Sequence, residues 1–315
     1  MKGIRVARSE RERLRLVELA EPILAPGEIL VRVEAASVSR IDVEMLDGWL
    51  GRDDDWAVPG CDAVGIIVGT NGSIGSLRIG DRVATIARPA AIGSGTYAEF
   101  LSVPAVQVVV VPDNLDAVIA AALPLAGLAA SQALYALMPE LGETILIHGA
   151  SGGVGTLAIQ LAKRLGVRVI ATASAAAAPL CEALGADLVV DSRPGEVINA
   201  LRRRLPGGCD ALLDLVDHDT QPDSAAMLAR RGRMVTLISV VNHVTLTDRR
   251  ITAWKVDMRP DRTVLRDLMT LASQGKLLPV IAAILPLAEA GGAHALLRQG
   301  GVQGKLILRV CEPTA

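Results

Sequence analysis

The chain is poor in aromatic residues and in cysteine, and both shortages limit what it can be. Its 315 residues include three Trp, two Tyr and one Phe, so its core must be built from Ala, Val, Leu and Ile. The four cysteines, Cys61, Cys181, Cys209 and Cys311, form no C-x-x-C pair. This spacing argues against a structural zinc lobe and a disulfide framework, and it is typical of a protein from the reducing cytoplasm.

Net charge also excludes some partners. The formal charge is −2, so no excess of positive charge favours nucleic acid or an anionic membrane surface, and we expect neither as a partner. Clusters of arginine at 202–204, 230–231 and 249–250 are balanced by acids elsewhere, and we interpret them as solvated faces. The charged and polar N-terminal segment does not have the pattern of a signal peptide, so we expect a cytoplasmic protein.

One long uncharged segment, Val118 to Met138, is about as long as a bilayer is thick. It is rich in Ala, contains Pro124 and Gly127, and has no basic flank. We therefore predict a buried core helix rather than a membrane span.

The length predicts two domains, because a single core rarely grows past about 250–300 residues. Residues 1–117 contain short strands, such as the alternating Glu28–Glu34, separated by Pro and Gly turns. Residues 118–258 alternate between strand and helix patterns, which predicts a parallel sheet covered on both faces. Residues 259–315 regain strand character, and we expect them to rejoin the first domain.

Residues 148–155, His-Gly-Ala-Ser-Gly-Gly-Val-Gly, lie between an apolar strand pattern (144–147) and a helix pattern (157–165). In the motif G-x-G-x-x-G, Ala150 takes the first place, Gly152 the second and Gly155 the third. Such a turn brings the N-terminus of a helix against a pyrophosphate. The motif and the strand that follows it predict dinucleotide binding by Ala150, Ser151, Gly152, Gly153, Val154 and Gly155. The alternative is a glycine-rich turn without a ligand.

A series of segments, in order, resembles the zinc-free quinone oxidoreductase branch of the medium-chain dehydrogenase/reductase superfamily. The segments are Pro59–Gly65, Ile79–Val83, Gly95–Phe100, Leu123–Leu128, the glycine motif, Leu184–Asp187 and Gly304–Leu308. The resemblance covers nearly the whole chain. It implies a Rossmann domain with a doubly wound parallel sheet (α/β), inserted in a β-rich GroES-like catalytic domain. It also implies a cleft between the domains and, usually, a homodimer.

The resemblance also bears on metal binding. Ser39 corresponds to the first Cys ligand of the catalytic zinc in zinc-dependent relatives, and Cys61 corresponds to the His ligand. Serine is a poor zinc ligand and one thiol does not hold Zn²⁺, so we expect no metal. Without zinc to acidify a hydroxyl, the resemblance favours reduction of an electrophilic acceptor over oxidation of an alcohol.

The choice of nicotinamide cofactor depends on the residues after the second strand. NAD-binding folds place an acid about 20 residues beyond the glycines, but residues 171–175 contain none. Ser174 can donate a hydrogen bond to a 2′-phosphate, as in NADPH-using relatives. Arg193 is either a positively charged partner of the 2′-phosphate or a surface arginine. Asp191 can partly neutralise the charge of Arg193. We therefore predict NADPH, with Val216, Ile238 and His243 completing the cofactor site.

Two catalytic features of the relatives are missing. The relatives' Asn-Pro-x-Asp is Ser39-Arg40-Ile41-Asp42 here, and Leu50 stands where relatives often have a Tyr donor. Ser39 is a candidate hydroxyl donor. Arg40 either stabilises an oxyanion or faces solvent. Trp49 either walls the pocket or donates its indole N–H.

These observations predict a zinc-independent, NADPH-dependent oxidoreductase. It transfers hydride to a small electrophilic molecule, either a quinone or an alkene conjugated to a carbonyl. One alternative is an enoyl-thioester reductase in a biosynthetic pathway. Another is a non-catalytic NADPH-binding redox sensor, because the usual Tyr and Asn are missing.

Overall fold

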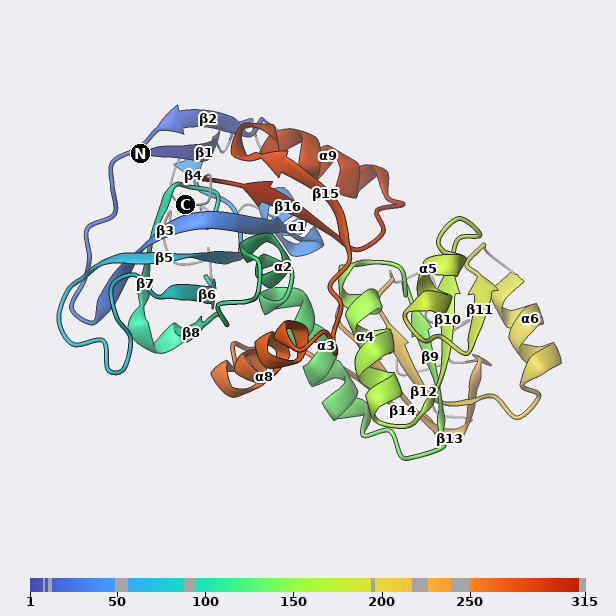
Figure 1. The fold of residues 1–315 in the computed structure, drawn as a ribbon. Coiled ribbons are helices and arrows are strands. Elements are labelled where there is room, and N and C mark those ends of the chain that lie inside the picture. Colours follow the sequence, from blue (N-terminus) through green and yellow to red (C-terminus); the bar gives the residue numbers. More distant parts are fainter. Residues whose placement is uncertain are drawn as a thin grey trace. The chain divides into compact units, whose positions relative to one another are not determined.

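The computed structural model describes residues 1–7, 9–10, 13–48, 56–87, 95–193, 196–216, 226–238 and 250–311. The chain forms two compact units (Figure 1). The first comprises Met1–Leu125 and Pro260–Ala315, and the second comprises Ala126–Arg259. The second unit is thus an insertion in the first, and the predicted α/β class with an inserted doubly wound sheet is confirmed.

The first unit is built mainly of strands. They are β1 (Lys2–Ala7), β2 (Arg15–Glu18), β3 (Glu28–Val38), β4 (Trp56–Ala57), β5 (Asp62–Thr70), β6 (Arg82–Ile86), β7 (Phe100–Pro104), β8 (Val108–Val110), β15 (Ile281–Pro286) and β16 (Lys305–Arg309). A small sheet has the order β2-β1-β4, and a larger one has the order β15-β16-β3-β5-β6-β8, with β7 also paired to β3. All these pairings are antiparallel except that of β15 with β16.

Helices and single 3₁₀ turns complete this unit. They are α1 (Arg40–Asp47), η1 (Ala105–Gln107), α2 (Ala117–Ala121), α8 (Arg262–Ser273), η4 (Leu287–Glu289) and α9 (Ala290–Gln299). Helix α2 contacts β3 and β5, so it belongs to the sheet of the first unit. The core is aliphatic, as the scarcity of aromatic residues requires, and it includes Ile4, Val33, Leu101 and Leu308.

Strand β3 positions the part of this unit that matters for function. Along one edge it pairs with β7 through its first half and with β16 through its second half, while β5 lies along its other edge. Residues 33–38 are all buried, because β3 runs through the middle of the sheet. In the register with β16, Leu306 lies opposite Val38, which brings the start of β16 beside the residue that follows β3.

The second unit is a parallel sheet with helices. Its elements are α3 (Pro124–Leu137), which begins two residues before the unit, β9 (Thr144–His148), α4 (Gly153–Arg164), β10 (Arg168–Ala173), α5 (Ala178–Ala183), β11 (Leu188–Asp191), α6 (Glu196–Arg204), β12 (Cys209–Asp214), β13 (Leu228–Thr236) and β14 (Thr252–Lys255). The strand order is β11-β10-β9-β12-β13-β14, and every pairing is parallel. This is the doubly wound order 3-2-1-4-5-6 of dinucleotide-binding sheets.

The local composition of the Ala-rich segment 225–229 predicts a helix. This prediction is wrong over part of its length, because Leu228 and Ala229 begin strand β13. Cys209 pairs with Leu228, and the Cys209 N–H donates a hydrogen bond to the Met227 carbonyl at 2.9 Å. Pairing with the neighbouring strand therefore outweighs the local helical propensity of alanine.

The uncharged segment 118–138 is divided between two helices, α2 and α3. Most of it is buried, including Leu128, Ala130 and Leu134, but the Tyr135 side chain is 84% exposed and Met138 is 64% exposed. Among the described residues, no helix is long and apolar enough to cross a membrane.

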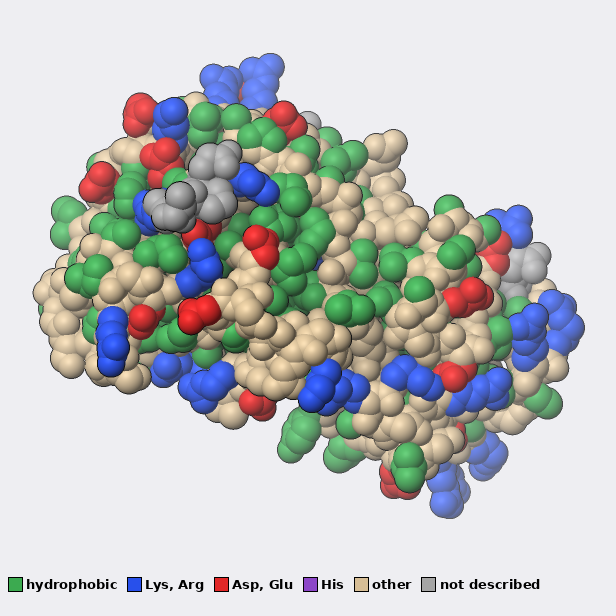
Figure 2. All heavy atoms as spheres, in the orientation of Figure 1, with side chains coloured by type: hydrophobic (Ala, Val, Ile, Leu, Met, Phe, Trp, Pro, Cys, Tyr) green, Lys and Arg blue, Asp and Glu red, His purple; other side chains and the backbone are tan. Residues whose placement is uncertain are grey.

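On the face of the molecule shown in Figure 2, charged side chains of both signs are interspersed with hydrophobic areas. Some surface charges form ion pairs, such as Lys163 with Asp187 at 2.8 Å. Exposed pairs of this kind contribute little to stability, about 0–1 kcal/mol each.

Candidate functional site

Four buried polar residues lie at the carboxyl ends of adjacent strands in the second unit. They are His148 on β9, Thr172 on β10, Asp214 on β12 and Thr236 on β13. The strand order reverses between β9 and β12, because the strands that follow β9 are added first on one side and then on the other. In open parallel sheets, ligands bind outside the carboxyl ends of the strands at this point.

The glycine loop leaves the sheet at this point. Gly149 has φ +71°, a backbone conformation that favours glycine. The tight turn is therefore made at Gly149, one residue before the place that the sequence motif assigned to Ala150. The Ala150 N–H is bonded to the Thr172 carbonyl at 3.2 Å, and Gly152 is the N-cap of α4.

Gly155 allows α4 to lie directly against this turn. A Cβ atom at Gly155 would lie 2.4 Å from the Gly149 carbonyl oxygen and 2.6 Å from the Ala150 Cα. Because both neighbours are backbone atoms, they cannot move aside as a flexible side chain can. The result is a partly exposed helix N-terminus of the kind that binds phosphates through backbone N–H groups.

The turns that follow β12 and β13 are held by side chains at the strand ends. Asp214 Oδ1 accepts a hydrogen bond from the Val216 N–H at 3.0 Å, and Thr236 Oγ1 accepts one from the Ile238 N–H at 3.2 Å. Both predicted cofactor residues therefore lie at the same edge of the sheet as the glycine loop. His243 lies outside the described residues.

His148 lies beneath the glycine loop and is kept neutral. Its Nδ1 lies 3.0 Å from Thr172 Oγ1, and burial lowers the pKa of its imidazole to about 4. A neutral imidazole at physiological pH adds no charge to a phosphate-binding edge. Its position at the strand end suits a role in holding β9 and β10 together.

Ser174 and Arg193 follow adjacent strands, so they are neighbours at this edge. In the pairing of β10 with β11, Ala173 lies opposite Asp191, and the Ser192 N–H donates a hydrogen bond to the Ala173 carbonyl at 3.0 Å. Ser174 is exposed. The Arg193 side chain is 76% exposed, and its Nε donates to Asp191 Oδ2 at 2.9 Å. Asp191 therefore competes with any anionic ligand for this guanidinium.

The first unit contains a buried polar cluster, which we call the Lys305 cluster: Ser39, Asp42, Asp62, Tyr97 and Lys305. Lys305 Nζ donates a hydrogen bond to Ser39 Oγ at 2.5 Å. The Ser39 N–H donates to Asp42 Oδ2 at 2.7 Å, as expected where Ser39 caps the N-terminus of α1. Tyr97 Oη donates to the same oxygen at 3.1 Å.

The two carboxyl groups of the Lys305 cluster are fully buried. Asp62 accepts hydrogen bonds from the Ser37 hydroxyl at 2.5 Å and from the Leu125 N–H at 3.1 Å. Burial, followed by the negative charge of Asp62, raises the pKa of Asp42 to about 6. Burial also raises the pKa of Asp62, and the Lys305 ammonium opposes both shifts.

His294 on α9 extends the cluster. Its Nε2 lies 3.3 Å from Tyr97 Oη, and the two rings meet edge to face with centroids 5.8 Å apart. Burial, followed by the charge of Arg298, lowers the pKa of His294 to about 4. Sequence reasoning singled out neither His294 nor Lys305. The available signal for Lys305 was a charged residue directly before an apolar run, Leu306–Leu308.

The three predicted catalytic residues have different surroundings. Ser39 is buried within the Lys305 cluster, whereas Arg40 is exposed at the first position of α1. Trp49, like Leu50, lies outside the described residues. Of the two that the structure describes, Ser39 alone is linked to an interior network.

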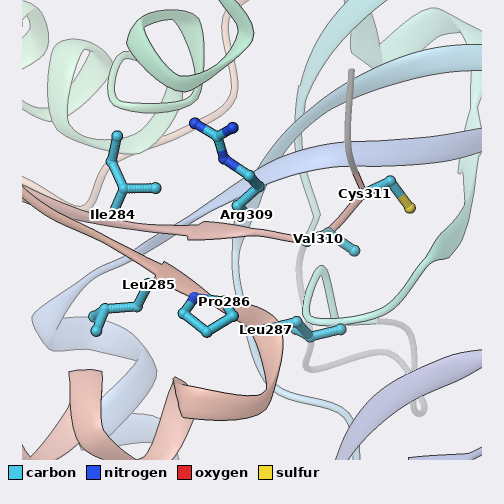
Figure 3. A pocket seen from close by; sticks show the side chains of 7 residues that line it. All are labelled: Ile284, Leu285, Pro286, Leu287, Arg309, Val310 and Cys311. Carbon is cyan, nitrogen blue, oxygen red and sulfur yellow. The ribbon is translucent and has the colours of Figure 1, made fainter. Parts of the chain in front are cut away.

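A surface depression of about 530 Å³ lies elsewhere in the first unit, along β15 and β16 (Figure 3). It is lined by Ile284, Leu285, Pro286, Leu287, Arg309, Val310 and Cys311. None of the predicted site residues lines it. Arg309 is the one charged side chain in its lining, and no set of polar side chains converges there to orient a substrate.

Comparisons with known proteins identify both units. The family "Alcohol dehydrogenase GroES-like domain" matches residues 25–113, and the family "Zinc-binding dehydrogenase" matches residues 184–308. The structure of a quinone oxidoreductase from Coxiella burnetii is 30% identical, with a TM-score of 0.90 and 99% of each chain covered.

Two curated relatives have different names. An "Alcohol dehydrogenase" of Geobacillus stearothermophilus is 26% identical and covers 96% of this chain and 97% of its own. A chloroplastic "NADPH-dependent alkenal/one oxidoreductase" of Arabidopsis thaliana is 28% identical and covers 91% of this chain and 73% of its own. Both are oxidoreductases, but their names do not agree on the substrate.

Ser39 and Cys61, at the positions of two zinc ligands in zinc-dependent relatives, do not fit the zinc ion that the family description "Zinc-binding dehydrogenase" implies. Burial raises the pKa of the Cys61 thiol well above its usual value, which disfavours the thiolate that zinc requires. The Ser39 hydroxyl already accepts a hydrogen bond from an ammonium, and a dication there would be repelled. Within the described part of the chain, no group of three or more His, Cys, Asp or Glu side chains is arranged to hold a metal ion.

The doubly wound sheet with its glycine loop, the antiparallel unit into which it is inserted, and the full-length likeness at 30% identity agree with one another. The chain belongs to the quinone oxidoreductase-like branch of the medium-chain dehydrogenase/reductase superfamily, and it is an oxidoreductase that uses a nicotinamide cofactor.

Proposed function

We propose that this protein is a zinc-independent, NADPH-dependent reductase of quinones or of alkenes conjugated to a carbonyl. The observation that carries the proposal is the Lys305 ammonium on Ser39, at the position corresponding to the first zinc ligand of zinc-dependent relatives. A fixed cation at this position disfavours a metal that would acidify an alcohol. It suits an acceptor that is already electrophilic and that gains negative charge when reduced.

The preference for NADPH is supported by the end of β10. No acid follows this strand to bind a ribose 2′-hydroxyl and to repel a 2′-phosphate. Ser174 offers a hydroxyl, and Arg193 offers a guanidinium that a 2′-phosphate would share with Asp191. The Arabidopsis relative is itself named as NADPH-dependent.

When bound, NADPH supplies the hydride; the residues of the chain bind and orient the reactants. The N–H groups at the start of α4 bind the pyrophosphate, and Gly155 keeps the helix close to the turn. The Ser39 hydroxyl donates a hydrogen bond to the acceptor oxygen that becomes negative. Preorganised donors of this kind stabilise developing charge without reorganising during the reaction.

The test is oxidation of NADPH against a panel of acceptors, with NADH as the control. The panel contains a polycyclic ortho-quinone, short 2-alkenals and enones, and an enoyl-thioester of coenzyme A. A parallel assay follows reduction of NADP⁺ by primary alcohols. We expect turnover of quinones or enones, no turnover of alcohols, and no loss of activity in a metal chelator. Oxidation of alcohols that the chelator abolishes would contradict the proposal.

The same panel separates the alternatives. Turnover of the coenzyme A thioester alone would indicate an enoyl-thioester reductase. Binding of NADPH without turnover of any acceptor would indicate a redox sensor. We further propose a homodimer, which sedimentation equilibrium would test.

A further inference from the structure

We propose that Lys305 and Ser39 form a proton-delivery pair, in which the Ser39 hydroxyl protonates the reduced acceptor and the Lys305 ammonium replaces that proton. This inference rests on the proposed function and adds to it the source of the proton. The usual phenolic donor of the family is absent from the sequence, where Leu50 takes its place.

The geometry of the pair is set by the pairing of β16 with β3. Leu306 lies opposite Val38, so Lys305 and Ser39 are neighbours at the point where β3 ends and α1 begins. Ser39 is 7% exposed and Lys305 is 5% exposed, and the Nζ–Oγ distance is 2.5 Å. Both side chains are therefore held in place by the sheet rather than by a mobile loop.

The hydroxyl in this pair is oriented to donate. A serine hydroxyl has one proton and two acceptor lone pairs, and Lys305 occupies one of the lone pairs. Among the described residues, none accepts a hydrogen bond from the Ser39 hydroxyl, so its proton is available to a ligand. Polarisation by the adjacent ammonium makes that hydroxyl a better donor.

The Lys305 ammonium is not part of a salt bridge among the described residues. Buried lysines are usually paired with a carboxylate, yet within the described part of the chain no carboxylate lies within salt-bridge distance of Lys305. Asp62 is held by Ser37 and Leu125. Asp42 is held by the Ser39 N–H and Tyr97. Asp42 and Asp62 therefore interact with the Lys305 ammonium only through longer-range electrostatics. The ammonium itself donates its hydrogen bond to the Ser39 hydroxyl.

The proton balance can be written for an enone. Hydride forms a new C–H bond at the β-carbon, and the displaced electron pair moves onto the carbonyl oxygen. That oxygen takes the Ser39 proton as the O–H bond breaks, and the serine oxygen takes a proton from Lys305 Nζ. Solvent then returns one proton to the amine, so the overall reaction consumes one NADPH and one proton and yields an enol that tautomerises to the ketone.

The deciding experiment uses the full-length protein and the acceptor on which the wild type turns over. Ser39→Ala removes the hydroxyl and Ser39→Thr keeps it. Lys305→Arg keeps the positive charge but cannot release a proton, because the guanidinium does not deprotonate in proteins. Lys276→Met, at an exposed lysine, is the matched control. The readouts are kcat, its pH profile, its solvent deuterium isotope effect, and the Kd of NADPH.

We expect Ser39→Ala and Lys305→Arg to lower kcat by about 100-fold or more, in the range typical of general acid catalysis. The Kd of NADPH should change by less than about twofold. Ser39→Thr, which retains a hydroxyl, should lose much less kcat than Ser39→Ala, and Lys276→Met should keep wild-type kcat. In Lys305→Ala, added methylammonium should restore part of kcat by replacing the missing amine.

The outcomes also separate this inference from the proposed function. If the wild type reduces the acceptor and Lys305→Arg keeps its kcat and pH profile, then Lys305 acts only through its charge and the inference is overturned. If the lysine variants fail to fold, Ser39→Ala decides, and an unchanged kcat and isotope effect would overturn the inference. If the wild type binds NADPH but reduces no acceptor, the proposed function fails and the inference fails with it.

Discussion

The two units bury polar side chains in contrasting ways. In the second unit, His148, Thr172, Asp214 and Thr236 lie along one edge of one sheet, each at the end of its own strand. In the first unit, the Lys305 cluster assembles residues from the N-cap and first turn of α1, from β5, from β16 and from the turn before β7. The sheet edge that carries the glycine loop is built by strand-turn-helix segments that are each continuous in the sequence. The Lys305 cluster, in contrast, depends on pairing between strands that are far apart in the sequence.

Gly155 tests the close packing in the second unit and carries the largest expected effect. In Gly155→Ala the new Cβ meets backbone atoms at 2.4–2.6 Å, so we expect a loss of about 3 kcal/mol of unfolding free energy and loss of NADPH binding. Urea unfolding and fluorescence titration would measure both. Gly207→Ala, where a Cβ meets nothing within 4 Å, is the control, and equal stability of the two variants would contradict the packing argument.

The buried carboxyl group of Asp42 in the first unit should make the unfolding free energy depend on pH. Its pKa of about 6 in the folded state exceeds the ordinary value of 3.8. Between these two pH values the folded protein therefore holds a proton on Asp42 that the unfolded chain has released. The contribution of Asp42 to stability is therefore largest below about pH 4 and falls as pH rises to about 6, by on the order of 3 kcal/mol. Asp42→Asn should reduce this slope in urea unfolding from pH 4 to 7, and Asp62, whose pKa burial also raises, should retain part of it. The exposed Asp267→Asn should keep the full slope, and an undiminished slope in Asp42→Asn would contradict the assignment to Asp42.

His148 should have the opposite pH dependence. Its pKa falls from 6.5 to about 4 on folding, so its contribution to stability is complete above about pH 6.5 and is lost as pH falls towards 4. The loss is on the order of 3 kcal/mol. His148→Asn should flatten this part of the unfolding profile. His294→Asn is the matched variant in the first unit, where the same sign is expected because burial also lowers the pKa of His294. A steeper loss of unfolding free energy with falling pH in either variant would contradict this interpretation.

Arg193 carries the smallest expected effect, because it is exposed and already paired with Asp191. Arg193→Ala should weaken NADPH binding about fivefold, corresponding to about 1 kcal/mol for an exposed charge pair, and leave NADH binding unchanged. Asp191→Asn should tighten NADPH binding, because it releases the guanidinium and keeps an oxygen for the Arg193 N–H. Calorimetric titration with both cofactors measures this, and equal effects on NADPH and NADH would exclude a 2′-phosphate contact.

Local patterns predicted much of the second unit. The apolar run at 144–147 predicted β9 to within one residue, because a buried parallel strand is a continuous apolar segment. The glycine motif predicted the turn before α4. Local patterns did not show that Gly149 rather than the next residue makes the tight turn, because backbone dihedral angles are not visible in a motif. They also failed at 228–229, where pairing with β12 overrides helical propensity.

The sequence by itself determined the family, the α/β class and the existence of a glycine-rich phosphate-binding turn, because these depend on residues that are close together in the chain. Only the tertiary structure decided that Lys305 meets Ser39 across 266 positions of sequence, and that Tyr97 and His294 extend the same network. The physical reason is that a β-sheet brings together residues by register, and register between distant strands is set by the packing of the whole core.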